Sequence, residues 1–419
     1  MKVVLISTSD KLGGASVASY RLGKAFDENN LDATMLVRDI SRDDNFIQRV
    51  GGLITNLQGK LLHAFEKLSF IPYEKSKELR FQFSSAKYGI DISKNKYVLE
   101  ADIIHLHWIN NGFLSWKSIE KLVRLGKPIV WTLHDRWVFT GGCHITKDCL
   151  NYEEQCGNCY YLKSPRSSDL SHQIWMKKQE IFRKGNFTFI TCSQFLGNMA
   201  KRSGLLSSQR VISIPNPIDT TFYFNKPNTL ELRAQFSLPK DKFCVLFIAG
   251  NIANKFKGLH YLIEALELIF KEGESTEIEL VVVGKDKNNI LSDVGIPYTF
   301  LGLMQNASEI VDIYNAVDIF VTPSIEDNLP NVVMESMACE TPVIGFKTGG
   351  IPEMVDDGIN GFIVSQKDVL ALKESILKLY NDRILLNTFK SKARKKIVDN
   401  YSNESVTKMF RKVYQDLLN

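Results

Sequence analysis

The sequence predicts an α/β fold in which parallel strands alternate with helices. Both halves of the chain repeat one plan: a short apolar run, a loop that contains glycine, and a helix with one apolar face. The first copy starts with the run at residues 3–6, and the second half opens with the run at residues 243–249. At about 100–200 residues per domain, a chain of 419 residues predicts two or three domains.

The composition is that of a globular protein, with 44% hydrophobic and 24% charged residues. The net charge of +5 comes from basic residues that are spread along the chain, and no basic nucleic-acid motif is present, so we expect no nucleic-acid partner. Weak attraction to anionic lipid or phosphate is the alternative to a plain solvated surface. The apolar run at the N-terminus is too short for a signal peptide, and no run approaches the ~18 apolar residues of a membrane span. We therefore expect a cytoplasmic protein, or one that lies on the inner face of the membrane.

Two glycines stand at the first turn from strand to helix. The run 3–6 leads into a polar loop with Gly13 and Gly14, and a helix follows from Ser16 to about Asp27. Glycine lets a ligand approach the backbone closely, although the dinucleotide fingerprint GxGxxG is absent here.

A further helix is predicted near residue 60, where Leu53, Leu57, Leu61 and Phe65 recur every four residues. The sequence leaves two interpretations of this apolar stripe. It packs against the N-terminal domain, or it forms an amphipathic surface that meets the membrane or a lipid-linked acceptor.

Histidines gather on two predicted strands. The strand 102–107 places His105 and His107 on one face, and the strand at 129–133 delivers His134 to its carboxyl end, where ligands collect in such sheets. With no third metal ligand nearby, we expect neutral, hydrogen-bonded histidines rather than a metal site. An imidazole at a strand end can donate to a sugar hydroxyl and stabilise developing charge, which makes His134 a catalytic candidate; a capping or core histidine is the alternative.

Four of the seven cysteines lie close together, at Cys143, Cys149, Cys156 and Cys159. Because the chain has no secretory signal, metal ligation explains this segment better than disulfides do. Four thiolates, or three with His144, could close a structural zinc site that has no open position for chemistry; reduced, unbound thiols are the alternative. The other three cysteines lie in apolar runs and are expected in the core.

Two acids flank a predicted helix in the second half. A strand at 319–321 leads into a polar loop, and Pro330 fits the first turn of a helix that continues through 332–339. Asp327 in the loop and Glu335 in the helix are therefore aimed at the crevice beyond the strand ends. Carboxylates suit the hydroxyls of a sugar or ribose, and the free N–H groups of a helix start suit phosphate. The alternative is that Asp327 or Asn328 merely caps the helix and that Glu335 is a solvated acid.

The spacing Asp327-x7-Glu335, followed by "SMACETPVIGFKTGGIPEMVDDGINGFIV", resembles the signature of the family 4 retaining glycosyltransferases, in which the first acid is usually glutamate. The resemblance implies the α/β GT-B fold, two Rossmann-like, doubly wound parallel-sheet domains that face a central cleft. The domains expected are 1–216 and 217–402, joined near "PNPID", with 403–419 as a helix that crosses back to the first domain. In addition, "HDRWVFTGGCH" resembles a bacterial subset of the family that is linked to capsule, exopolysaccharide and O-antigen assembly.

The resemblance also implies roles for single residues. Lys257 would hold the donor pyrophosphate, Lys255 would stand in for an arginine usual in the family, Glu335 would contact the ribose, and His134 the transferred sugar. Donor binding would extend to the sugar and the phosphates through Asp327, the loop residues Asn328, Leu329 and Asn331, and the glycines Gly13 and Gly14. No Asp-x-Asp metal motif is present, so no catalytic cofactor is expected.

The activity implied is transfer of a sugar, with retention, from a nucleotide-diphosphate-sugar donor to a saccharide or polyprenyl-linked saccharide acceptor in bacterial surface polysaccharide biosynthesis. Two other interpretations remain, a nucleotide-sugar epimerase of the same fold and a non-catalytic scaffold subunit of a polysaccharide assembly complex. The sequence does not specify the base or sugar of the donor, the acceptor, the linkage or the oligomeric state.

Overall fold

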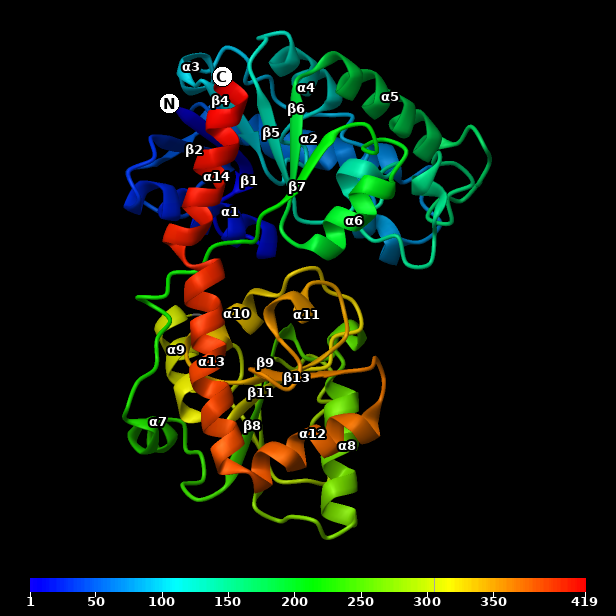
Figure 1. Cartoon of the computed structure of the whole chain (residues 1–419). Coiled ribbons are helices and arrows are strands. Elements are labelled where there is room, and N and C mark those ends of the chain that lie inside the picture. Colours follow the sequence, from blue (N-terminus) through cyan, green and yellow to red (C-terminus); the bar gives the residue numbers. More distant parts are fainter. Residues whose placement is uncertain (305) are drawn as a thin grey trace. The chain divides into compact units, whose positions relative to one another are not determined.

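The structure, a computed structural model, describes residues 1–304 and 306–419, with the side chains at positions 53, 54 and 56 excepted. The described chain divides into two compact units. The N-terminal unit comprises Met1–Pro217 together with Val406–Asn419, and the C-terminal unit comprises Ile218–Ser405. Each unit has a parallel sheet of its own with helices on both faces (Figure 1).

The sheet of the N-terminal unit has seven strands within the described residues, in the order β3-β2-β1-β4-β5-β6-β7. All neighbours pair in parallel, and the strand order reverses between β1 and β4. Such a reversal leaves a crevice at the carboxyl ends of the strands, where ligands bind. The strands are β1 (Val3–Ser9), β2 (Ala33–Asp39), β3 (Ile47–Arg49), β4 (Ile103–Leu106), β5 (Ile129–Leu133), β6 (Phe187–Thr191) and β7 (Arg210–Ser213).

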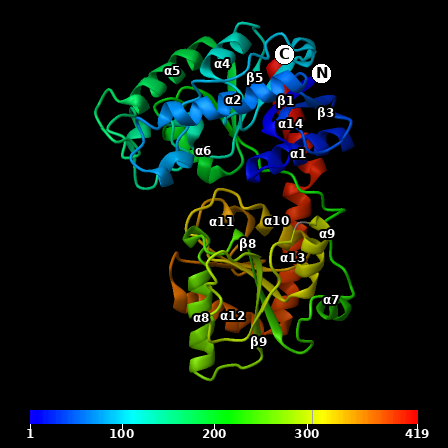
Figure 2. The same cartoon turned by 180° about the vertical axis from the view of Figure 1, so that it is seen from behind.

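Both faces of this sheet are buried, which explains why its strands are continuous apolar runs. In β1, Val3 and Leu5 pack with α1 (Gly14–Glu28) and α14 (Asn403–Leu418) on one face. Val4 and Ile6 belong to the core on the other face, which Figure 2 presents, with α2, α4 and α5. The further helices of the unit are α2 (Leu53–Phe70), α3 (Lys96–Glu100), α4 (Trp116–Val123), α5 (Leu170–Lys184) and α6 (Gln194–Arg202), with short 3-10 turns at Lys77–Gln82, Trp137–Phe139 and Asn151–Glu153.

The last helix, α14, is part of the N-terminal unit although it ends the chain. Thr407 donates a hydrogen bond to the carbonyl oxygen of Ala25 in α1. The rings of Phe410 and Tyr414 pack edge-on against Phe26, 5.6 and 5.9 Å away. The helix therefore completes the core on that face of the sheet.

The C-terminal unit repeats the same plan. Its sheet has six strands within the described residues, in the order β10-β9-β8-β11-β12-β13, so the order reverses between β8 and β11. The core on one face is closed by α8 and α12. The strands are β8 (Phe243–Asn251), β9 (Ile278–Lys285), β10 (Tyr298–Phe300), β11 (Ile319–Thr322), β12 (Val343–Phe346) and β13 (Gly361–Val364). The helices are α7 (Thr229–Gln235), α8 (Leu259–Lys271), α9 (Ala307–Ala316), α10 (Asn331–Ala338), α11 (Ile351–Met354), α12 (Val369–Asn381) and α13 (Arg383–Tyr401), with a 3-10 turn at Lys255–Lys257.

The predicted α/β class with two doubly wound parallel sheets is confirmed. One detail differs: Pro330 does not lie in the first turn of α10 but precedes it as the N-cap, with φ −68° and ψ 120°. An extended ψ suits a residue that enters a helix, and the helix then begins at Asn331. None of the helices in the described part of the chain combines the length and the apolar character that a membrane span requires.

Candidate functional site

The strand order of the C-terminal unit reverses between β8 and β11, and the loops that follow these two strands carry the predicted donor residues. Lys257 ends the 3-10 turn after β8, and Asp327 lies in the loop after β11. The Lys257 Nζ lies 2.5 Å from Asp327 Oδ2, so the two loops are joined by an ion pair. Lys255 is exposed and makes no ion pair within the described residues, so the structure does not bring it to this pair.

Two glycines allow these loops to pack so closely. Gly258, at φ +76°, would carry a Cβ only 1.9 Å from the carbonyl oxygen of Pro323. Gly349, at φ +53°, would carry one 2.0 Å from the carbonyl oxygen of Asp327. Neither separation is compatible with a side chain, and a positive φ disfavours every residue except glycine. The neighbouring Gly350 N–H also donates to the carbonyl oxygen of Asn328, at 2.5 Å.

Helix α10 presents the second acid. Glu335 is only 8% exposed, and the hydroxyl of Tyr314 lies 3.4 Å from its Oε2. Asp327 accepts from Lys257 and from the backbone N–H of Asn328 rather than capping α10, which has no side-chain cap. The alternative of a side-chain cap from Asp327 or Asn328 and a solvated Glu335 is therefore wrong. Both acids lie in the segment that follows the carboxyl end of β11.

The start of α10 has a buried side-chain oxygen without a partner within the described residues. The side-chain Oδ1 of Asn331 is buried and accepts no hydrogen bond within the described residues. Leu329, two positions earlier, is buried. A buried, unpaired acceptor is costly, and such groups gather where a ligand completes the hydrogen bonding.

In the N-terminal unit, Gly13 is the N-cap of α1, with φ +87°. No heavy atom lies within 4 Å of a Cβ built on Gly13 or Gly14, and no side chain caps this helix. The first N–H groups of α1 therefore stand at the carboxyl end of β1 without a side-chain acceptor. Strand β1 neighbours β4, and β4 neighbours β5, which carries His134 at its end.

His134 belongs to a line of three histidines at the ends of β4 and β5. His134 Nε2 lies 3.1 Å from His107 Nδ1, and the rings of His107 and His105 are 4.3 Å apart. His105 in turn bonds to Thr132 Oγ1 at 2.7 Å and to the hydroxyl of Tyr414 at 2.6 Å. The predicted placement of His105 and His107 on one side is confirmed.

Burial keeps these histidines neutral at pH 7. It lowers the pKa of His105 to about 3 and that of His134 to about 4, and it lowers the pKa of His107 well below 6.5. His107 Nε2 has no hydrogen-bond partner within the described residues, and an orphaned N–H is the costlier state. We infer that the proton of His107 sits on Nδ1 and is donated to His134 Nε2. The proton of neutral His134 then sits on its own Nδ1.

Asp135 anchors the loop that follows His134. Its carboxylate accepts from the backbone N–H of Trp137 at 2.8 Å and from His144 Nδ1 at 2.7 Å, and His144 Nε2 bonds to Ser84 Oγ at 2.9 Å. Burial favours the neutral acid, but the charge and hydrogen bond of His144 outweigh it and lower the pKa of Asp135. His144 is thus a partner of Asp135, a role that the sequence did not reveal.

Lys178 in α5 is a second residue that the sequence analysis missed. It is fully buried, donates to the carbonyl oxygens of Trp137 and Thr140, and lies 4.2 Å above the ring of Trp137. Burial lowers its pKa to about 7. The signal was its position in register with Ile174 and Ile181 on the apolar face of α5, where lysine is rare.

The four clustered cysteines line one narrow cavity of about 20 Å³, and all four are free. Burial raises the pKa of three of these thiols, those of Cys143, Cys156 and Cys159, to about 12, so they are protonated. Among the described residues, no three His, Cys, Asp or Glu side chains form a group that could hold a metal ion. The thiols do come together as expected, whereas the zinc site stays a prediction of the sequence.

The comparisons with known proteins agree with this architecture. Residues 12–222 match Glycosyltransferase Family 4, and residues 243–382 match Glycosyl transferases group 1. The capsular polysaccharide biosynthesis glycosyltransferase CapM of Staphylococcus aureus is 30% identical over 188 residues, 43% of this chain and 48% of CapM. A D-inositol 3-phosphate glycosyltransferase of Corynebacterium aurimucosum is 23% identical over 344 residues, 78% of this chain and 76% of the relative. The chain covers 65%, 54% and 52% of three further curated relatives.

Among solved structures, HepE of Anabaena in complex with UDP has a TM-score of 0.65 and 16% identity, with 99% of this chain and 100% of that one covered. At such an identity the likeness shows the fold alone. The family match extends over half of the sequence and includes Gly13, Gly14 and His134. This chain is therefore a member of glycosyltransferase family 4.

Proposed function

We propose that the chain is a retaining glycosyltransferase that takes a sugar from a nucleotide-diphosphate-sugar donor. The observation that carries this proposal is the Lys257–Asp327 pair at the point where the strand order reverses. An ammonium group there offsets the charge that develops on the leaving phosphate, and the start of α10 offers backbone N–H groups. Glu335 suits a ribose, and Asp327 with Asn328, Leu329 and Asn331 suits the sugar. HepE, which has a similar fold, was solved in complex with UDP, and this supports a uridine-nucleotide sugar as the first donor to test.

In this proposal His134 acts on the transferred sugar. A neutral imidazole can make a hydrogen bond to a sugar hydroxyl, and the low pKa of His134 keeps this imidazole neutral across the physiological range. No separate nucleophile is assigned: the leaving phosphate takes the proton of the acceptor hydroxyl while the new bond forms on the same face of the sugar. Gly13 and Gly14 leave room for the phosphates or the acceptor beside the start of α1.

The acceptor that we propose is a saccharide or a polyprenyl-linked saccharide of bacterial surface polysaccharide biosynthesis. The name of CapM supports a capsular product, although only about half of CapM is matched. A lipid-linked acceptor requires contact with the inner face of the membrane, and helix α2 offers a surface for it.

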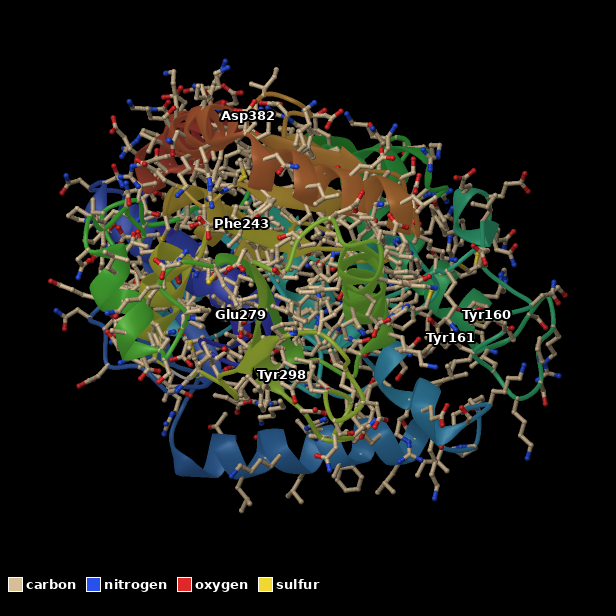
Figure 3. All side chains as sticks on the ribbon, turned by 90° about the horizontal axis from the view of Figure 1, so that it is seen from below. Tyr160, Tyr161, Phe243, Glu279, Tyr298 and Asp382 are labelled. Carbon is tan, nitrogen blue, oxygen red and sulfur yellow. The ribbon has the colours of Figure 1, made fainter. Side chains whose placement is uncertain are left out.

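Helix α2 turns apolar side chains outward. Leu57, Leu61, Phe65 and Leu68 are 62%, 52%, 51% and 58% exposed, so the interpretation in which this stripe packs against its own domain is wrong; the Leu53 side chain lies outside the described residues. In Figure 3, α2 is the blue helix along the lower edge, with side chains that point away from the ribbon. An outward apolar stripe suits the interface of a bilayer.

Membrane contact can be tested by flotation with vesicles that contain phosphatidylglycerol. We expect the parent chain to float with the vesicles and the variant Leu61→Ser/Phe65→Ser to stay in solution. The control Leu370→Ser/Ile384→Ser removes apolar side chains of the C-terminal unit that are at least as exposed, and it should float like the parent. Equal flotation of all three proteins would remove α2 from the proposal.

The activity itself is tested by incubating the purified chain with a panel of nucleotide sugars and following the anomeric protons by NMR. Slow release of sugar that first has the donor's anomeric configuration supports a retaining transferase. Isomerised donor would identify an epimerase of the same fold. An unchanged panel would identify a scaffold subunit.

A further inference from the structure

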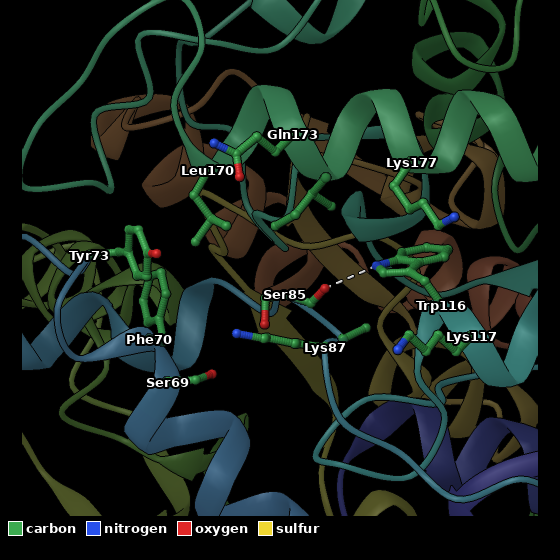
Figure 4. A pocket seen from close by; sticks show the side chains of 12 residues that line it. Ser69, Phe70, Tyr73, Ser85, Lys87, Trp116, Lys117, Leu170, Gln173 and Lys177 are labelled. Atoms are coloured by element: carbon green, nitrogen blue, oxygen red, sulfur yellow. Dashed lines mark hydrogen bonds between the residues drawn. The ribbon is translucent and has the colours of Figure 1, made fainter.

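A cavity of about 320 Å³ lies within the N-terminal unit, and the proposed transfer reaction does not use it (Figure 4). Its wall comes from the end of α2, the loop that precedes residue 88, the start of α4 and the first half of α5. The volume is at the lower end of the range for ligand sites. The lining residues are Ser69, Phe70, Tyr73, Ser85, Ala86, Lys87, Trp116, Lys117, Leu170, Gln173, Ile174 and Lys177.

The floor of the cavity is apolar. Phe70, Ala86, Trp116 and Ile174 are almost fully buried and belong to the core of the unit. The indole N–H of Trp116 already donates to the carbonyl oxygen of Ser85 at 2.9 Å, so the ring has no polar group left for a ligand (Figure 4). Such a wall favours a hydrocarbon chain over a sugar, since hydroxyls would lose their hydrogen bonds to water.

The mouth of the cavity is basic. Lys177 forms ion pairs with Glu120 at 2.5 Å and with Glu180 at 3.2 Å. Lys87 and Lys117 are exposed and make no ion pair within the described residues. None of the described residues that line the cavity is acidic. Two ammonium groups that make no ion pair within the described residues, above an apolar floor, favour an anionic headgroup that carries an apolar chain.

The basic rim is held in place by a buried acid of α2. Both carboxylate oxygens of Glu66 accept hydrogen bonds from the loop: from Ser85 Oγ and Ala86 N at 2.7 Å each, and from Lys87 N and Tyr88 N at 3.1 and 3.2 Å. Glu66 lies on the inner side of α2, while Leu61, Phe65 and Leu68 lie on the outer side. The same helix therefore forms both the outward apolar stripe and one wall of the cavity.

We propose that this cavity binds a prenyl phosphate, with the chain on the apolar floor and the phosphate between Lys87 and Lys117. It would hold the lipid end of the acceptor, so the inference rests on the proposed lipid-linked acceptor. A site for the lipid would keep the acceptor on the enzyme while the saccharide end reacts.

A direct test uses farnesyl phosphate with a diazirine at the end of its chain, below its micelle concentration. Light should link the probe to peptides that contain residues 69–73, 85–87 or 170–177, identified by mass spectrometry. Titration of unmodified farnesyl phosphate, followed by tryptophan fluorescence, should show at least tenfold weaker binding in Lys87→Glu/Lys117→Glu and in Ser69→Trp, which fills the cavity from a half-exposed position. Farnesol and inorganic phosphate should each bind at least tenfold more weakly to the parent.

The matched control Lys271→Glu/Lys287→Glu reverses two exposed lysines of the C-terminal unit and should bind the probe like the parent. Equal binding by the Lys87/Lys117 and Lys271/Lys287 variants, or crosslinks confined to the outer side of α2, would overturn the cavity assignment. Turnover of a soluble donor without lipid is measured on every variant and should be unchanged. If the parent itself never turns over a donor, the proposed function fails, whereas loss of the cavity assignment alone leaves donor turnover intact.

Discussion

The ammonium group of Lys257 lies 2.5 Å from Oδ2 of Asp327, and this ion pair joins the loops that follow β8 and β11. The side chains are 34% and 16% exposed, so water screens the pair and its net contribution to stability is small. The ion pair instead preorganises the site. A lysine without an ion-pair partner would lose side-chain entropy when it binds a pyrophosphate, whereas Asp327 already restrains the side chain of Lys257.

Replacing Lys257 should therefore affect binding far more than folding. For Lys257→Ala we expect donor affinity at least tenfold weaker by calorimetric titration, with the free energy of unfolding changed by less than about 1 kcal/mol. Lys271→Ala, an exposed lysine in the same unit, is the control and should leave both quantities unchanged. Unfolding of the C-terminal unit in Lys257→Ala with donor affinity retained in the folded fraction would assign the pair a structural role instead.

Gly349 should be required for the position of Asp327. In Gly349→Ala the new Cβ would meet the Asp327 carbonyl oxygen at 2.0 Å in a backbone conformation with φ +53°. We expect the C-terminal unit to lose about 1–3 kcal/mol and donor affinity to fall with it. Gly250→Ala, where a Cβ meets no atom within 4 Å, should change stability by less than about 0.5 kcal/mol. Equal melting by scanning calorimetry in the two variants would refute this strain argument.

His107 should act as a positioning residue for His134. For His134→Ala we expect kcat at least a hundredfold lower with little change in KM, because the interaction strengthens in the transition state. His107→Leu roughly keeps the volume but removes the hydrogen bond to His134 Nε2, and kcat should fall about tenfold. If KM rises while kcat stays constant in either variant, these histidines bind substrate and do not assist the reaction.

The stability of the N-terminal unit should fall in mild acid. The folded pKa of His105 is about 3, below the 6.5 of an unfolded histidine, so the unfolded chain binds the extra proton between these values. Stability from this residue is complete above pH 6.5 and is lost as the pH falls, by about 1.4 kcal/mol per pH unit between pH 5.5 and 4. His134 and His107 add to the loss over the same range.

All five tryptophans lie in the N-terminal unit, so their fluorescence follows its unfolding by urea. In His105→Gln the slope of unfolding free energy against pH should be smaller by about 1.4 kcal/mol per pH unit, the contribution of one proton. An unchanged slope would mean that His105 is protonated in the folded unit.

The sequence predicted the elements well where a motif and a strand end coincide. The β-branched run Ile129–Leu133 forms strand β5, and the parallel order places the following His134 beside the carboxyl ends of the neighbouring strands. Lys257 and Asp327 could be placed from the sequence for the same reason, because they lie in the segments that follow β8 and β11. Residues in loops at the ends of parallel strands need no knowledge of distant contacts.

Contacts between distant segments could not be predicted. Tyr414 bonds to His105 across 309 positions, and only the packing of α14 on the sheet brings them together. The four-residue spacing of Leu57, Leu61 and Phe65 identified a helix but not the direction of its apolar stripe, because periodicity does not distinguish a face that packs from a face that is exposed. The burial of Lys178 could not be predicted either, because a lysine is expected at the surface unless its hydrogen-bond partners are known.

The central claim is that the loops after β8 and β11 hold the donor nucleotide. Hydrogen exchange of the backbone amides, measured by mass spectrometry with and without the nucleotide sugar that the chain turns over, tests it most directly. We expect slower exchange in peptides that cover residues 255–258 and 324–335. Protection confined to other peptides, or none at saturating donor, would contradict it.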